Sequence, residues 1–324
     1  MVVLALGALI GSGGAVALAV EDEDIFDPPA QETTPARVDY ELTITGVEDR
    51  ELRDLLESAS QLRALVKRPP ATIAGLERRV RDDLARLQAV MKSEGYYAAT
   101  LRYEIDSAAR PTAVRMNVVP GTRYTIAAFE IGYTGTANPS KGHRPTLQDI
   151  GIRLGMPARA PTVKSAERKA LTVLGERGYA FAKSEDLNVV VSHADQRMTI
   201  RLSVDSGRQA RFGQLAITGP TDVEEDYIRR LVTWNEGDVY DRRLIASTRS
   251  ALSETNLFSS IKISTAPKLA SDRRLPVAIE LSERPRRSIG AGVSYSTDVG
   301  FGGEVFWEHR NILRRNERLR LTLK

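Results

Sequence analysis

Three stretches of the chain carry apolar residues at the three- and four-residue spacing of an amphipathic helix. They cover Ile73–Glu94, Thr162–Arg177 and Asp241–Thr255, and the first has its apolar positions at Ile73, Leu76, Val80, Leu84, Leu87 and Met91. Each stretch stops at a residue that tolerates a left-handed backbone: Gly95, Gly178 and Asn256. These end points lie 83 and 78 residues apart, so the pattern indicates an internal repeat.

Short alternating segments surround each long helix in the same order. The expected strands are Tyr40–Thr45, Tyr96–Ile105 and Ala113–Val119, then Ile126–Tyr133, Phe181–Val191 and Met198–Asp205, then Phe212–Thr218, Leu257–Ser264 and Leu275–Ser282. A further helix is expected at Val47–Ser58, near Thr146–Arg153, and from Asp222, where Glu225 completes a capping-box-like pair. Each copy therefore predicts a strand–helix–helix–strand–strand unit, a small α+β domain.

The copies follow one another with almost no linker. In the phrases VVPGTRYTIAAFEI and VDSGRQARFGQLAI, the last strand of one copy passes within a few residues into the first strand of the next. We therefore predict units over residues 38–125, 126–210 and 211–287. Gly95, Gly121, Gly178 and Gly207 are expected to be structural, because glycine supplies positive φ at helix ends and turns.

The last 37 residues have a different pattern. Small or polar residues alternate with Ile289, Ala291, Val293 and Tyr295, and basic or polar residues alternate with Leu319, Leu321 and Leu323. Strands of outer-membrane barrels alternate apolar lipid-facing residues with small or polar lumen-facing ones. Residues 288–324 therefore predict the first strands of an antiparallel barrel. Because the smallest barrels need about eight strands, we expect the barrel to be truncated here.

Composition narrows the function classes. Forty-six basic residues are scattered among forty-two acidic ones, whereas a nucleic-acid binder concentrates its charge on one face, so no nucleic-acid partner is expected. The chain has no cysteine, which excludes disulfides, thiolate metal sites and cysteine nucleophiles. His143, His193 and His309 are isolated, and the sequence has no HExxH, G-x-S-x-G or Walker A motif. We therefore expect no catalytic site, no bound metal and no cofactor.

The N-terminal residues indicate export. Residues 1–20 are apolar or small, end in Ala17-Leu18-Ala19 and are followed at once by four acidic residues. This pattern predicts a secretory signal peptide, with a membrane anchor as the alternative. Residues 21–37, rich in acidic residues, proline and threonine, predict a flexible linker.

The repeated units, with GDVYDRRLIASTRSALSETNLFSSIKIS in the last copy, resemble POTRA domains. The following IGAGVSYSTDVGFGGEVFWEHRNILRRNERLRL resembles the start of a barrel of the BamA/TamA superfamily. Three units before a barrel are most similar to the TamA-like assembly factors. The resemblance implies an outer-membrane protein, not an enzyme, with POTRA domains in the periplasm that help insert barrel proteins and autotransporters.

The same resemblance implies the partners: unfolded outer-membrane and autotransporter clients, a TamB-like periplasmic partner anchored in the inner membrane, and outer-membrane lipid. Clients would pair with a sheet edge such as Leu257, Ser259, Ile261 and Ile263. The first barrel strand, with Ile289, Gly290, Gly292, Val293 and Tyr295, would form one side of a seam that opens.

Two alternatives stay open for the whole chain, namely a two-partner secretion transporter and a purely periplasmic scaffold. Two also remain for the stretch Arg284, Pro285, Arg286 and Arg287, which is either a stiff solvated junction or a contact with anionic headgroups at the membrane face.

Overall fold

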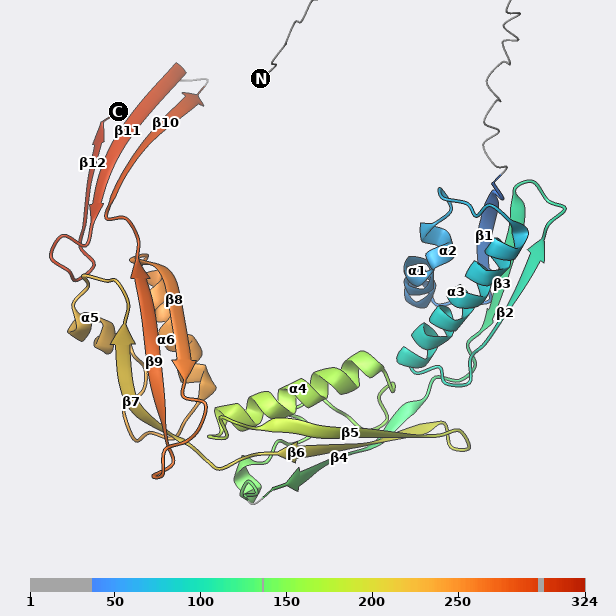
Figure 1. Ribbon diagram of the computed structural model, residues 1–324, viewed down its shortest axis with the longest axis horizontal. Helices are drawn as coiled ribbons and strands as arrows, with labels where there is room; N and C mark the ends of the chain where they lie inside the picture. Colours follow the sequence, from blue (N-terminus) through green and yellow to red (C-terminus); the bar gives the residue numbers. More distant parts are fainter. Residues whose placement is uncertain (1–36, 136, 297–299, 324) are drawn as a thin grey trace, which may run out of the picture.

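The computed structural model describes residues 37–135, 137–296 and 300–323 as four three-stranded sheets, three of them with helices (Figure 1). The predicted signal peptide, residues 1–20, and all but the last residue of the predicted linker, residues 21–37, lie outside these described residues. No helix in the described ranges is both long and apolar enough to span a bilayer.

The first mixed sheet follows the sequence prediction closely. Its elements are β1 Tyr40–Thr45, α1 Arg50–Ala59, α2 Gln61–Ala64, α3 Ile73–Ser93, β2 Thr100–Asp106 and β3 Thr112–Val119. The order β1-β3-β2 makes β3 the central strand, parallel to β1 and antiparallel to β2. Leu76, Val80, Leu87 and Met91 of α3 pack on buried residues of the sheet to form the core.

The first short helix begins later than predicted, because Asp49 caps it by accepting a hydrogen bond from the N–H of Leu52 (3.2 Å). The helix α2 was not predicted from the sequence. Ser60 separates the two helices and caps α2 through the N–H of Arg63 (3.1 Å). Its hydroxyl also donates to the buried carboxylate of Asp83 on α3 (2.6 Å), which joins the helices.

The second sheet repeats the topology with the order β4-β6-β5. Its elements are β4 Thr125–Thr134, the 3-10 turn η1 Lys141–His143, α4 Ala160–Glu176, β5 Lys183–Ser192 and β6 Arg197–Asp205. The helix predicted near Thr146–Arg153 is wrong. Thr146 and Asp149 cap a single turn reciprocally (2.8 and 3.2 Å), and Gly151 at φ 75° then turns the chain out of the helical path.

The third sheet has the order β7-β9-β8. Its elements are β7 Arg211–Thr218, α5 Glu225–Arg230, α6 Arg242–Glu254, β8 Phe258–Thr265 and β9 Arg274–Glu283. The predicted capping-box pair of Asp222 and Glu225 is wrong. The N-cap residue of α5 is Glu224, which makes no side-chain cap, and Asp222 instead pairs with Arg286.

The fourth sheet is antiparallel and has no helix. It consists of β10 Arg287–Ser296, β11 Gly300–Arg310 and β12 Arg318–Leu323 in the order β10-β11-β12. Figure 1 shows the three mixed sheets following one another along an open arc, with the fourth sheet extending from the end of the third. The predicted α+β units and C-terminal strands are thus present as sheets, and closure into a barrel stays a prediction.

Candidate functional site

The edge strand β8 presents backbone groups that no neighbouring strand uses. At the end of β9, the N–H of Glu283 donates to the carbonyl of Pro220 on the β7 side (3.3 Å), whereas the N–H of the next residue, Arg284, donates to the carbonyl of Leu257 on the β8 side (2.7 Å). Successive residues of a strand point their N–H and C=O groups to opposite sides, so the even-numbered residues of β9 hydrogen-bond to β8. Their partners on β8 are Ser260, Lys262 and Ser264. Ile261 and Ile263 lie opposite odd-numbered residues of β9, with which they make no backbone hydrogen bonds.

Ile261 and Ile263 therefore direct their N–H and C=O groups away from the sheet. Their side chains are half-buried and pack on the core under α6, so the edge is open only at the backbone. One of these groups is already occupied, because the guanidinium of Arg249 on α6 donates to the carbonyl of Ile261 (2.9 Å). The side chain of Arg249 thus covers part of the edge.

The structure places the other two predicted edge residues differently. Leu257 precedes β8, is buried in the core, and its carbonyl is used by Arg284. Ser259 lies where the β8–β9 register shifts, and its hydroxyl donates to the carbonyl of Ser282 (3.1 Å). Of the four residues, Ile261 and Ile263 are the two that present outward backbone groups, and the role of this edge in binding stays a prediction.

The stretch Arg284 to Arg287 connects the third sheet to the fourth. Arg284 turns back to its own sheet, where its side chain donates to the carbonyl of Phe258 (2.8 Å). Arg286 pairs with Glu283 (3.1 Å) and with Asp222. Arg287 is the first residue of β10. Two of the three arginines are thus engaged in protein contacts, and the contact with anionic headgroups stays a prediction.

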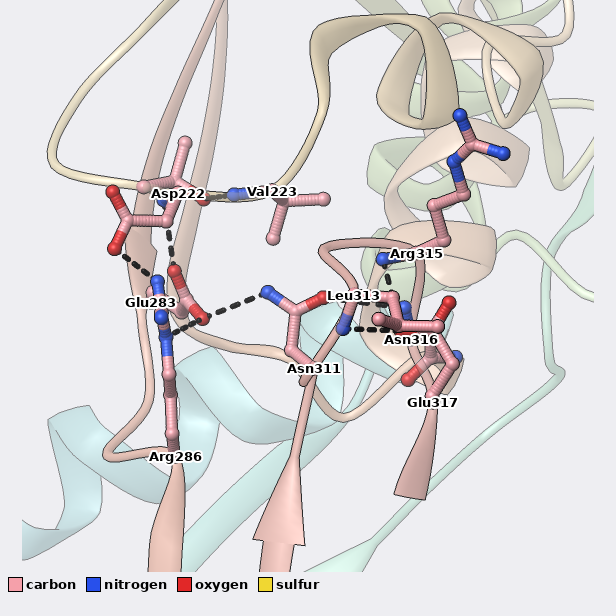
Figure 2. A network of polar contacts seen from close by, with 10 residues as sticks. Asp222, Val223, Glu283, Arg286, Asn311, Leu313, Arg315, Asn316 and Glu317 are labelled. Atoms are coloured by element: carbon pink, nitrogen blue, oxygen red, sulfur yellow. Dashed lines mark hydrogen bonds and ion pairs between the residues drawn. The ribbon is translucent and has the colours of Figure 1, made fainter. Parts of the chain in front are cut away.

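Glu283 is the centre of a polar network that joins the two sheets (Figure 2). Its carboxylate accepts hydrogen bonds from the N–H of Asp222 (2.9 Å), the side-chain amide of Asn311 (3.0 Å) and the guanidinium of Arg286 (3.1 Å). We call these four residues the junction network. It ties β9, the segment before α5 and the β11–β12 loop together.

The β11–β12 loop is shaped to reach the third sheet. The carboxylate of Glu317 accepts from the backbone N–H groups of Leu313 (3.1 Å) and Arg315 (3.2 Å), as Figure 2 shows. The backbone carbonyl of Glu317 accepts from the N–H of Asn311 (2.6 Å). Asn311, Arg314 and Asn316 have positive φ values of 58°, 69° and 73°. The side chain of Glu317 therefore holds a strained, tight loop in one shape.

The same loop makes a second contact with the third sheet, at the N-terminus of α5. The N–H of Glu224 donates to the carbonyl of Arg314 (3.1 Å), and the side chain of Arg315 pairs with the carboxylate of Glu224 (2.7 Å). The loop thus holds both the end of β9 and the start of α5.

The junction network changes the acidity of Glu283. Partial burial by itself raises the pKa of a carboxyl group, but the hydrogen bonds from Asp222, Asn311 and Arg286 outweigh it. The pKa of Glu283 therefore lies below its usual value, and the carboxylate is ionised at neutral pH.

One face of the fourth sheet is apolar and exposed. The register aligns Ile289, Trp307 and Leu321 across the three strands, and Ala291, Val305 and Leu323 beside them. The side chains of Ile289, Val293, Val305, Leu319, Leu321 and Leu323 are between 45% and 84% exposed. An apolar face of this extent in a three-stranded sheet needs an apolar environment to be stable.

The predicted seam residues lie on both faces of β10. Ile289 and Val293 belong to the apolar face. At Gly290 a Cβ atom would stand 2.4 Å from the ring of Phe306, so glycine leaves the room for this ring. Glu304 would be 3.4 Å from a Cβ at Gly292, which is ordinary contact. The side chain of Tyr295 lies outside the described side chains.

The predicted structural glycines all have left-handed backbones. Their φ values are 94° for Gly95, 69° for Gly121, 103° for Gly178 and 63° for Gly207.

Within residues 37–135, 137–296 and 300–323, no three His, Asp or Glu side chains gather closely enough to hold a metal ion. His143 lies in η1 and His309 in β11, while His193 accepts or donates a hydrogen bond at the buried Tyr124 (2.9 Å).

Residues 210–284, which contain the third sheet, match the POTRA family, described as "Surface antigen variable number repeat". The chain is 26% identical over 180 residues to the outer membrane protein assembly factor BamA of Neorickettsia risticii (strain Illinois), covering 55% of this chain and 23% of that protein. It is 20% identical over 245 residues to the protein of the same name from Buchnera aphidicola subsp. Acyrthosiphon pisum (strain APS), covering 75% of this chain and 39% of that protein.

The crystal structure of BamA from Haemophilus ducreyi lacking POTRA domains 1–3 has a similar fold, with a TM-score of 0.52 and 22% identity over 61% of this chain and 37% of that one. The predicted resemblance to POTRA domains is confirmed over residues 210–284, and the relatives are BamA proteins, while the closer resemblance to TamA-like factors stays a prediction. This chain spans 23% and 39% of the length of these two curated relatives.

Proposed function

We propose that this chain belongs to an outer-membrane protein assembly factor of the BamA superfamily. In this proposal the three mixed sheets lie in the periplasm and the fourth sheet lies in the outer membrane. One observation carries the proposal: the junction network fixes the fourth sheet, which has an exposed apolar face, to the third sheet. The third sheet is the last of three mixed sheets that leave strand edges open.

The proposed mechanism needs no cofactor and no nucleotide. A client barrel protein that has not closed carries unpaired strand edges, and these are very costly in lipid. Strand β8 can pair with such an edge through the outward N–H and C=O groups of Ile261 and Ile263. The outer edge of β10 can do the same inside the membrane, where it would form one side of a seam.

The finer proposal is a TamA-like factor. In this proposal the clients include autotransporters, the periplasmic sheets also receive a TamB-like partner anchored in the inner membrane, and Arg287 with its neighbours lies at the height of the lipid headgroups. Its support is the arrangement of three POTRA-type sheets directly before the fourth sheet in this chain.

Site-specific crosslinking in cells tests the proposal. A photo-reactive amino acid at Ser264, exposed on β8, is expected to crosslink to unfolded outer-membrane barrel proteins, identified by mass spectrometry. The control is the same amino acid at Ser253, exposed on α6 of the same unit. Equal client crosslinking at both positions, or none from Ser264, would contradict the proposal. Autotransporters among the Ser264 products, and a TamB-like protein, would support the finer assignment.

A further inference from the structure

The joint between the first and second units is built from backbone hydrogen bonds. The N–H of Tyr124 donates to the carbonyl of Gly95 at the end of α3 (2.9 Å), and the carbonyl of Tyr124 accepts from Ala158 (2.9 Å). One step further, the N–H of Ile126 donates to Met156 (2.9 Å). We call this set the first joint.

The joint between the second and third units repeats these bonds one for one. The N–H of Ala210 donates to Gly178 at the end of α4 (2.8 Å), and the carbonyl of Ala210 accepts from Tyr240 (3.0 Å). The N–H of Phe212 donates to Asp238 (2.8 Å). This second joint therefore has the same backbone geometry, and the side chains at matching positions can be compared directly.

The first joint carries an ionic clamp. The carboxylate of Glu94 is only 8% exposed, and it accepts from Arg123 (3.1 Å) and Arg159 (2.7 Å). Arg123 also donates to the carbonyl of Glu94 (2.8 Å). Glu94 belongs to the first unit and Arg159 to the second, so a rotation between the units would separate a nearly buried charge from its partner.

Aromatic contacts add to the first joint. Tyr124 is buried, lies 5.4 Å from the ring of Tyr97 in the first unit, and hydrogen-bonds to His193 in the β5–β6 turn of the second unit (2.9 Å). Backbone hydrogen bonds, the ion pairs of Glu94 and the Tyr124–His193 hydrogen bond thus all hold the first joint.

The second joint has none of these side chains. Arg177 stands at the position of Glu94, Gln209 at that of Arg123, and Asp241 at that of Arg159. Arg177 pairs with Asp149 inside its own unit (3.0 Å), and Asp241 pairs with Arg243 inside the third unit (2.6 Å). Among the described residues, no ion pair crosses the second joint.

Alanine replaces the two tyrosines at the second joint. Ala180 and Ala210 stand where the first joint has Tyr97 and Tyr124. Besides the backbone hydrogen bonds that both joints share, the side-chain contact across the second joint is apolar, because Phe181 and Ala180 pack on the core of the third unit. Beside them lies an open groove of roughly 540 Å³, lined by residues including Leu171, Tyr179 and Ile245. Apolar contacts are non-directional, so they permit rotation that an ion pair resists.

From this contrast we propose that the chain bends at the second joint, around residues 206–210, while the first joint holds the first two units as one rigid body. Bending at the second joint would let the third unit and the fourth sheet change direction relative to the first two units. This inference does not depend on which partners the chain binds.

Distance distributions between paired spin labels test the proposal in the full chain, purified in detergent. The chain has no cysteine, so cysteines introduced at the exposed residues Ala85 on α3, Arg168 on α4 and Ser247 on α6 would carry the labels. The 168–247 distribution is expected to be at least about twice as wide as the 85–168 distribution. Equal widths would overturn the proposal.

Variants then test the cause. Glu94→Gln is expected to widen the 85–168 distribution about twofold, whereas Glu130→Gln, which removes an exposed ion pair within the second unit, is expected to leave it unchanged. The triple variant Arg177→Glu, Gln209→Arg and Asp241→Arg transfers the clamp to the second joint, and is expected to narrow the 168–247 distribution. An unchanged 85–168 width in Glu94→Gln would overturn the proposal even if the triple variant fails to fold.

Discussion

At the scale of single residues, the connection between the third and fourth sheets depends on Glu283. Its side chain is only 11% exposed, yet it stays ionised because three donors from three separate segments surround it. Removing its charge would weaken the acceptor of the Asp222 N–H and would leave Asp222 as the one carboxylate paired with Arg286. Such a loss costs more than the net gain of one hydrogen bond, since the remaining groups stay partly desolvated.

The pH dependence of this connection follows from the lowered pKa of Glu283. Stabilisation by the junction network is expected to be complete above the unfolded pKa of about 4.3, and to be lost as pH falls through the lower folded pKa. Glu283→Gln is expected to reduce the free energy of unfolding of the third unit by about 1–2 kcal/mol at pH 7 and to flatten its fall as the pH drops below about 4.3. Urea unfolding at several pH values measures both. If the free energy of unfolding of Glu283→Gln fell equally steeply at acid pH, the pH dependence would belong to another carboxylate.

Residue positions differ in how far the sequence could predict them. The positive φ of Gly95 and Gly178 was predictable, because a glycine that directly follows a helical pattern is a local signal. Glu283 carried no such signal. Its partners Asp222 and Asn311 are 61 and 28 residues away in sequence, and only the folded chain brings them together.

At the scale of elements, the open backbone of β8 makes a prediction that separates main chain from side chain. Ile263→Pro removes an outward N–H and is expected to reduce client crosslinking from Ser264 about tenfold, provided the unit stays folded. Ile263→Ala is the matched control, since it removes the same side chain and keeps the N–H. Equal crosslinking in the two variants would contradict pairing through this edge.

Removing the Arg249 side chain is expected to have the opposite effect on client crosslinking at the same strand. Its guanidinium occupies the outward carbonyl of Ile261, so Arg249→Ala is expected to free an acceptor and raise client crosslinking from Ser264 a few-fold. Circular dichroism would establish that the fold is unchanged. Arg243→Ala, on the same helix but paired with Asp241, is the control and is expected to change nothing at β8. A decrease in Arg249→Ala would instead show that the arginine helps to bind clients.

Elements were predictable where one pattern ran long enough. The helices α3, α4 and α6 lie within about two residues of their predicted ranges, because their apolar faces recur over several turns. The segment near Thr146–Arg153 carried a helix start but only one turn, and Gly151 ended it. The short α2 gave no pattern at all, since four residues are less than two turns.

At the scale of the whole molecule, the fourth sheet is expected to lower the solubility of the chain in water and to stabilise the third unit. Deleting residues 288–324 removes the exposed apolar face, so solubility is expected to rise, as light scattering would measure. The first two units are expected to keep their stability. The third unit is expected to lose about 1–2 kcal/mol of unfolding free energy, because the side-chain amide of Asn311 no longer donates to Glu283.

This deletion also simplifies the measurement. Of the two tryptophans, Trp307 is removed, so tryptophan fluorescence then comes from Trp234 alone, which lies in the core of the third unit and reports its unfolding. A fall in solubility on deletion would show that the apolar face is not exposed in solution.

The repeated strand order has a mechanical consequence. In every mixed sheet the chain enters on one strand and leaves on its parallel neighbour: β1 and β3, β4 and β6, β7 and β9. A pull along the chain would therefore slide the two strands past each other and load all of their hydrogen bonds at once, rather than peeling them apart one by one. Tension between the two ends of the chain would pass through these three strand pairs in series. Each pair would be loaded in shear, the direction in which paired strands resist separation most strongly.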